Sequence, residues 1–156
     1  MDALWREFSA GFSDWNEFAS TALHLVVATI LGGVVGLERE RAGRWAGLRT
    51  HMLVALGSAL LVVGMMQLDL DADGISRVVQ GIATGIGFIG AGSILKIPEE
   101  RQIEGLTTAA GIWVTAAVGV AAGLGLLGSA TLTVVVTWLV LKSLRFFEKR
   151  EHHGST

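Results

Sequence analysis

The sequence predicts an all-α membrane protein, a polytopic bundle of about five transmembrane helices preceded by a short N-terminal interfacial helix. Of its 156 residues, 51% are hydrophobic and 17% are charged. None of the 26 charged residues falls in four stretches that together hold 94 residues, namely 18–37, 50–68, 78–95 and 105–141. A helix at the surface of a soluble protein carries polar side chains on its outer face, so stretches of this kind are typical of helices surrounded by lipid.

The lengths of these stretches predict the number of spans. A helix needs about 20 mainly apolar residues to cross the hydrocarbon core of a bilayer. The first three stretches contain 20, 19 and 18 residues, so we expect each to cross once. The fourth contains 37 residues and fits two crossings joined by a tight turn at Gly123-Leu124-Gly125, which Gly128 follows. Glycine adopts the left-handed conformations that close a helix end.

Residues 1–17 are predicted to form a short helix in the outer membrane interface. Their large apolar side chains recur at helical spacing, and indole rings favour the headgroup level. These residues are Leu4, Trp5, Phe8, Phe12 and Trp15. A loosely ordered tail is the alternative. The chain then divides into an outer interfacial segment, 1–17, a transmembrane domain, 18–145, and a short cytoplasmic tail, 146–156.

The distribution of Lys and Arg predicts the orientation of the chain, because cytoplasmic loops carry an excess of these residues. Two of them, Arg6 and Arg77, fall on one side of the membrane and ten fall on the other. The ten are Arg39, Arg41, Arg44, Arg49, Lys96, Arg101, Lys142, Arg145, Lys149 and Arg150. We therefore expect the N-terminus outside and the C-terminus in the cytoplasm, which agrees with an odd number of spans.

Composition also excludes several kinds of function. The chain has no cysteine, which excludes a disulfide framework, a thiolate metal site and a cysteine nucleophile. Its net charge of -2 argues against a nucleic-acid partner, since phosphate recognition needs an excess of Lys and Arg. No arrangement of residues resembles a catalytic triad, a zinc site or a paired acid and base. We expect a non-enzymatic protein without a bound cofactor, whose immediate partner is the lipid bilayer.

Small residues form ridges on three predicted helices, and in lipid such ridges let helix backbones approach closely. The ridge of the fourth span has a small residue at every fourth position: Thr107, Gly111, Thr115, Gly119 and Gly123. The glycines assigned to helix packing are Gly32, Gly36, Gly81, Gly85, Gly87, Gly90, Gly92, Gly111 and Gly119. We expect them to build the bundle or a homo-oligomer. Helices that line a pathway or move as a gate are the alternative.

Ionisable residues gather at the predicted cytoplasmic edge of the first two spans. His51 follows Arg49 and Thr50 at the start of the second span. It is expected to face the end of the first span at Glu38, Arg39 and Glu40. The short connection between the two spans brings these groups close together. The cluster could join the helix ends by ion pairing, or it could bind a phosphate, a carboxylate or a partner protein. Charges that extend from helix ends into water are the simpler alternative.

The predicted outer loop contains Asp69, Asp71 and Asp73 followed by Gly74, which is the beginning of a calcium-binding D-x-D-x-D-G loop. The twelfth position, where such a loop has a bidentate Glu, is Gln80. Two interpretations stay open. The loop holds an ordered Mg²⁺ or Ca²⁺ ion and acts as an outer sensor, or three carboxylates attract such ions without a defined site.

Three segments, taken in order, resemble the MgtC/SapB family of membrane proteins. They are GLERE at 36–40 with AGLRTHMLV at 46–54, GIGFIGAGSI at 85–94 preceded by Arg77 and Gln80, and GLTTAAGIWVTAAVG at 105–119. Asp73-Gly74-Ile75-Ser76 stands in place of the Asp-Pro-Ser pattern of that family. The chain also stops at Thr156, whereas many relatives continue into a soluble cytoplasmic domain.

The resemblance implies a bacterial inner-membrane protein associated with adaptation to low magnesium and, in pathogens, with survival inside host cells. It implies a regulator of other membrane machinery, including the rotary ATP synthase, rather than a magnesium transporter. The partner or ligand site that it points to consists of Glu38, Arg39, Arg49, Thr50, His51, Gln80, Thr107 and Thr108. A small oligomeric transporter or channel for a cation or a proton is the alternative function.

Overall fold

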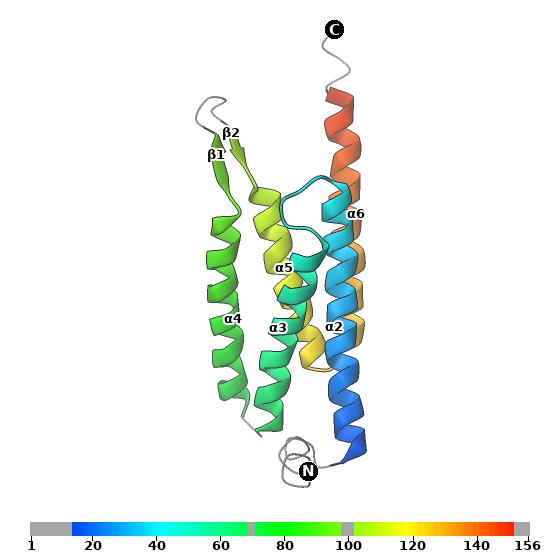
Figure 1. Ribbon diagram of the computed structural model, residues 1–156, viewed down its shortest axis with the longest axis vertical. Coiled ribbons are helices and arrows are strands. Elements are labelled where there is room, and N and C mark those ends of the chain that lie inside the picture. The colour runs from blue at the N-terminus through cyan, green and yellow to red at the C-terminus, as the bar shows by residue number, and fades with distance from the viewer. Residues whose placement is uncertain (1–13, 69–70, 98–101, 152–156) are drawn as a thin grey trace, which may run out of the picture.

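A computed structural model describes residues 14–68, 71–97 and 102–151 of the chain, which form a helical bundle with one small hairpin (Figure 1). Its elements are α2 (Trp15–Arg41), α3 (Leu48–Gln67), α4 (Ala72–Gly92), β1 (Leu95–Ile97), β2 (Gln102–Glu104), α5 (Leu106–Gly123) and α6 (Leu127–Glu151). The α2–α3 connection, the hairpin and the end of α6 lie at one end of the bundle, which we call the hairpin end (Figure 1).

The prediction of a five-helix membrane bundle is confirmed. Helices α2, α3 and α5 are long and apolar enough to cross a membrane, and α6 contains a shorter apolar segment, Leu127–Ser143. The predicted turn in the fourth stretch is present between α5 and α6, where Gly125 has a φ of 77°. Of the predicted interfacial helix, residues 1–13 lie outside the described residues, whereas residues 15–17 form the first turn of α2.

The predicted limits of the third span, 78–95, are wrong at both ends. Helix α4 begins at Ala72 because the side chain of Asp71 caps it, accepting a hydrogen bond of 2.8 Å from the backbone N–H of Gly74. At the other end α4 stops at Gly92, and Leu95 belongs to strand β1. A capping carboxylate can start a helix in a polar segment, which an apolar stretch alone does not reveal.

The hairpin between α4 and α5 was not expected from the sequence. Strands β1 and β2 pair antiparallel, with Leu95 opposite Glu104 and Ile97 opposite Gln102. Gly105 joins β2 to α5 with a φ of 93°, and a Cβ at this position would overlap the carbonyl oxygen of Ser93. Any larger residue at position 105 would collide with that carbonyl, so only glycine fits at the junction between the hairpin and α5.

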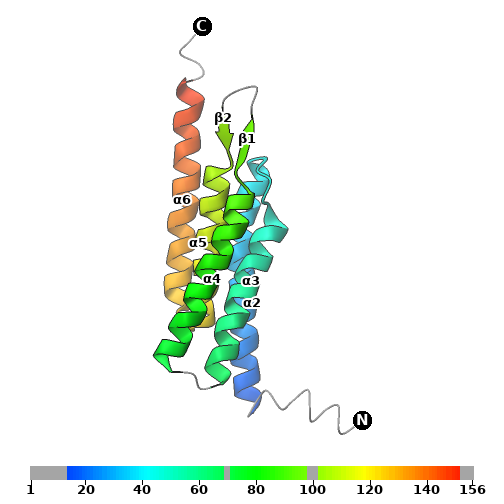
Figure 2. The ribbon, with the colours of Figure 1, turned by 90° about the vertical axis from the view of Figure 1, so that its left-hand side faces the viewer.

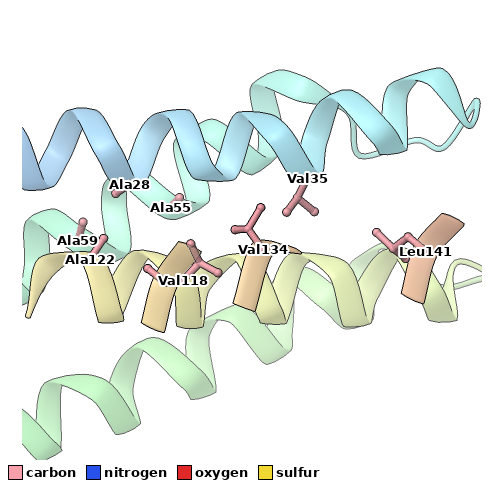
Figure 3. Packing of buried hydrophobic residues seen from close by; sticks show 9 residues of the cluster. Ala28, Val35, Ala55, Ala59, Val118, Ala122, Val134 and Leu141 are labelled. Atoms are coloured by element: carbon pink, nitrogen blue, oxygen red, sulfur yellow. The ribbon is translucent and has the colours of Figure 1, made fainter. Parts of the chain in front are cut away.

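The centre of the bundle is made of small side chains (Figure 3). Four helices contribute to it, with α2, α3 and α5 in close contact and α6 covering α2 and α5 (Figures 1 and 2). The side chains shown in Figure 3 include Ala28, Val35, Ala55, Ala59, Val118, Ala122, Val134 and Leu141. Because alanine and valine fill little space, the helix backbones lie close together.

Glycines on two helices make this close approach possible. On α2, a Cβ at Gly32 would lie 2.6 Å from the carbonyl oxygen of His51, and one at Gly36 would lie 2.8 Å from the Cα of Leu48. On α5, a Cβ at Gly119 would overlap the carbonyl oxygen of Ala55. Helix α3 is therefore held between the glycine faces of α2 and α5.

Most glycines of α4 have a different environment. Apart from the chain neighbours and the nearby backbone of α4 itself, no described residue comes within 4 Å of a Cβ placed at Gly81, Gly85, Gly87 or Gly92. A Cβ at Gly90 would lie 3.6 Å from Ala109 of α5. Helix α4 thus packs on α5 through Ile82, Ile86 and Gly90. The four glycines with open surroundings do not build the bundle within one chain.

The glycine contacts predict which substitutions the fold tolerates. Gly119→Ala forces a Cβ against the α3 backbone, and overpacking of this kind costs about 1–3 kcal/mol of the free energy of unfolding. Gly57→Ala on α3 adds the same atom in open space and is the matched control. Thermal unfolding in detergent should give a lower Tm for Gly119→Ala than for Gly57→Ala. Equal Tm values would contradict the close contact between α3 and α5.

Candidate functional site

Four of the predicted site residues are buried near the hairpin end, and we call them the buried polar cluster. Glu38 and Arg39 lie in the last turn of α2, His51 in the first turn of α3 and Thr108 in the first turn of α5. Their exposed fractions are 9%, 2%, 0% and 1%. The cluster is therefore enclosed where three helices meet, rather than displayed on the surface.

An ion pair between sequence neighbours lies at one side of this polar cluster. Arg39 Nε donates to Glu38 Oε2 over 2.6 Å, and both side chains are shielded from solvent. Burial strengthens the attraction between the two charges but also removes the hydration that each would have in water. The pair consequently depends on both partners being present.

His51 links α3 to the same cluster. Its Nδ1 lies 2.9 Å from the carbonyl oxygen of Gly47, so the ring donates from Nδ1, and Nε2 of the neutral ring is an acceptor. A Cβ at Gly111 would lie 3.6 Å from His51 Nε2 and 3.9 Å from Arg39 Cδ, so this part of α5 lies against both side chains. Within the part of the chain that the structure describes, His51 Nε2 and Arg39 Nη1 have no hydrogen-bond partner. The cluster thus offers one acceptor and one donor to a small polar molecule.

A second polar contact closes the connection between α2 and α3. Glu40 Oε2 accepts a hydrogen bond of 2.9 Å from the backbone N–H of Leu48, the first residue of α3. The N-cap residue, Gly47, has no side chain that could do this, so a carboxylate from the preceding helix caps α3 instead. From the sequence, Glu40 is expected beside Glu38 and Arg39 at the end of the first span, but its capping of α3 is not predicted. A helix start that lacks Ser, Thr, Asp or Asn is the signal that could have indicated it.

The remaining predicted site residues do not join the cluster. Arg49, Gln80 and Thr107 are exposed and Thr50 is half-buried. Gln80 lies on α4, where its side-chain nitrogen is 3.5 Å from Ser76 Oγ of the same helix. The predicted single site is therefore divided into a buried part, on α2, α3 and α5, and an exposed part.

The ridge predicted along α5 also turns around the helix. Thr107 was expected to share a face with Gly111, but Thr108 is buried and Thr107 is exposed. Each step of four residues rotates by about 40° beyond a full turn, because an α-helix has 3.6 residues per turn. Over the four steps from Gly123 back to Thr107 the rotation is about 160°, so Thr107 lies on the side of the helix opposite Gly123.

The outer aspartates are only partly described. Asp69 lies outside the described residues, Asp71 caps α4, and Asp73 is exposed in the first turn of α4. Across the described ranges, no group of three or more His, Asp or Glu side chains is placed to hold a metal ion. A magnesium or calcium site at Asp69, Asp71 and Asp73 stays a prediction.

An apolar groove of about 530 Å³ runs between α3 and α4. Its lining includes three glycines, Gly57 of α3 and Gly81 and Gly85 of α4, together with large apolar side chains of both helices. The sequence showed that α4 is rich in glycine, but it did not show which of these glycines face away from the bundle.

Comparison with known proteins identifies the family. Residues 25–150 match the model of the MgtC family. The chain belongs to the MgtC family. The resemblance seen in the sequence is thereby confirmed, and the first and last matched residues lie in α2 and α6, so the match covers all five described helices.

Several MgtC relatives are similar over most of this chain. Protein SrpB of Synechococcus elongatus is 39% identical over 88% of this chain and 82% of its own length. The "Putative magnesium transporter YhiD" of Escherichia coli (strain K12) is 42% identical over 86% of this chain and 67% of its own length. Protein MgtC of Brucella abortus is 44% identical over 84% of this chain, which spans about half, 54%, of that relative. No solved structure matches the chain.

The buried ion pair gives a prediction about stability. Arg39→Met removes the ionic partner of the buried Glu38 carboxylate, and breaking a buried pair in this way costs about 3–5 kcal/mol of the free energy of unfolding. The double variant Glu38→Gln/Arg39→Met removes both charges and should regain part of that loss. Thermal unfolding in detergent gives the Tm of the unmodified chain, of Arg39→Met and of the double variant. A double variant less stable than Arg39→Met would contradict this energetic account of the ion pair.

Proposed function

We propose that this chain is a non-enzymatic regulatory protein of the bacterial inner membrane that acts by binding another membrane protein. Membership of the MgtC family supports the assignment to this class. The Escherichia coli relative is named for magnesium transport, which supports a role connected with magnesium. The family resemblance adds adaptation to low magnesium and to conditions inside host cells, with the rotary ATP synthase as one example of a partner.

The observation that carries the proposal is the groove between α3 and α4. Its three glycines expose helix backbone on a surface that faces lipid, and nearby Phe88 of α4 is 84% exposed. In a bilayer, helices associate where small residues let backbones come close, because van der Waals contact is then large. A transmembrane helix of a partner protein, or of a second copy of this chain, fits this surface.

The buried polar cluster has a supporting role in this proposal. Glu38, Arg39, His51 and Thr108 are enclosed by the helices of their own chain and do not reach a partner directly. They fill the space between the ends of α2, α3 and α5. The groove then has a fixed wall on the α3 side, against which the partner helix packs.

The orientation that we propose places the hairpin end in the cytoplasm and the N-terminus outside. The α2–α3 connection, the hairpin and the end of α6 lie at the same end of the bundle (Figure 1). The segments with the ten basic residues are therefore on one side of the membrane, which supports the orientation expected from an excess of Lys and Arg in cytoplasmic loops.

A matched pair of variants tests the docking surface. Gly85→Leu fills the groove, whereas Gly87→Leu places the same side chain on another part of α4, in open space outside the groove lining. The chain is cross-linked in native membranes and affinity-purified. Gly85→Leu should then capture at least about tenfold less of the partner protein or of the second copy, which corresponds to about 1.4 kcal/mol of binding free energy. Gly87→Leu should behave like the unmodified chain. Equal capture by both variants would contradict the proposal.

A small oligomeric transporter or channel is the second candidate function. The open glycine face of α4 favours it, because copies of the chain that pack through this face would bring several α4 helices together. The name of the Escherichia coli relative is consistent with it. Purified protein in liposomes separates the two candidates: a transporter gives a Mg²⁺ or proton flux that Gly85→Leu abolishes, and a regulator gives none.

A further inference from the structure

The α2–α3 connection forms a second pocket, of different chemistry, at the hairpin end. It has a volume of about 370 Å³ and is lined by Glu40, Arg44, Trp45, Gly47, Leu48, Arg49 and Thr50. We call it the basic pocket. Arg44 and Arg49 are exposed at its edge, and Thr50 contributes a half-buried hydroxyl-bearing side chain.

The segment that forms the basic pocket carries an excess of positive charge. Three arginines, Arg41, Arg44 and Arg49, accompany a single acidic residue, Glu40, in the segment 40–50. Neither Arg44 nor Arg49 forms an ion pair with any residue that the structure describes. Glu40 already accepts the backbone N–H of Leu48, so its carboxylate is engaged in capping α3. The pocket therefore presents two free guanidinium groups to an anion.

A hydrophobic side chain at the same place indicates where that anion comes from. Trp45 is 80% exposed and lies between the two arginines in the sequence, in the connection between α2 and α3. An exposed indole is costly in water but favourable at the headgroup level of a bilayer. Arginine binds phosphate oxygens through paired N–H donors. The combination fits a phosphate that is attached to the membrane.

We propose that the basic pocket binds the phosphate of an anionic phospholipid, with Arg44 and Arg49 on the phosphate and Trp45 inserted beside the headgroup. The site does not depend on the proposed function, because it uses neither the groove nor α4. A bound lipid would brace the α2–α3 connection, and Thr50 adjoins His51 of the buried polar cluster. Anionic lipid would thus stabilise the junction on which that cluster is built.

The test uses the purified full chain in a neutral detergent and three probes: phosphatidylglycerol, phosphatidylcholine and inorganic phosphate. Lipid binding is counted by native mass spectrometry, and Tm is measured in parallel. Phosphatidylglycerol should bind in a defined stoichiometry and raise the Tm, since a ligand specific for the folded state stabilises it. Phosphatidylcholine and inorganic phosphate should do neither. Equal effects of both lipids, or an equal effect of inorganic phosphate, would overturn the proposal.

Variants locate the binding to the pocket. Arg44→Gln/Arg49→Gln should weaken phosphatidylglycerol binding at least about tenfold, because both charge-assisted contacts are lost. Arg77→Gln, which removes an exposed arginine from α4, should leave binding unchanged. Trp45→Ala should weaken phosphatidylglycerol binding. It should not change how that binding depends on salt concentration, because both arginines remain. If the double glutamine variant fails to fold, Arg44→Lys/Arg49→Lys keeps the charge and should bind with intermediate affinity. Wild-type binding by the double glutamine or double lysine variant would overturn the assignment to this pocket.

Discussion

The close approach of three helix backbones is the constraint on which the rest of the structure depends. Helix α3 has no room to move between Gly32 and Gly36 of α2 on one side and Gly119 and Gly123 of α5 on the other. Because the helices are this close at their centres, their ends at the hairpin end converge as well. Charged and polar side chains that would otherwise extend into water are enclosed there, and Arg39, His51 and Thr108 become part of the interior.

This constraint also explains the contrast between the two glycine-rich parts of the chain. Glycines on α2 and α5 pack against α3 within the bundle, whereas Gly81 and Gly85 of α4 and Gly57 of α3 line an open groove. Glycine therefore lets helices of this chain pack closely in the bundle, and in the groove it leaves a surface open to another helix. The buried cluster and the open groove are two different features, although both involve α3.

Much of the fold could be predicted from the sequence because lipid imposes a simple rule. The absence of charge from the long apolar stretches indicated five helices, and glycine at position 125 indicated the turn between the last two. The start of α4 and the hairpin were missed because they depend on one capping side chain, Asp71, and on three-residue strands. Such local hydrogen bonds leave no trace in hydropathy.

The candidate site could be predicted only in part. Proximity along the chain correctly brought Glu38, Arg39 and His51 together, since a short connection joins their helices. It could not show that the side chains are buried, because burial depends on α5, which comes from a distant part of the sequence. It also could not decide between Thr107 and Thr108, where a difference of one residue rotates a side chain by about 100°.

Cysteine labelling of two adjacent positions tests most directly whether the polar cluster is sealed inside the bundle. The chain has no cysteine, so Thr107→Cys and Thr108→Cys each introduce a single thiol. In membrane vesicles treated with a small maleimide, the thiol at position 107 should react readily, whereas the thiol at position 108 should be protected until the protein is unfolded in detergent. Equal labelling of both positions in the folded protein would contradict the account.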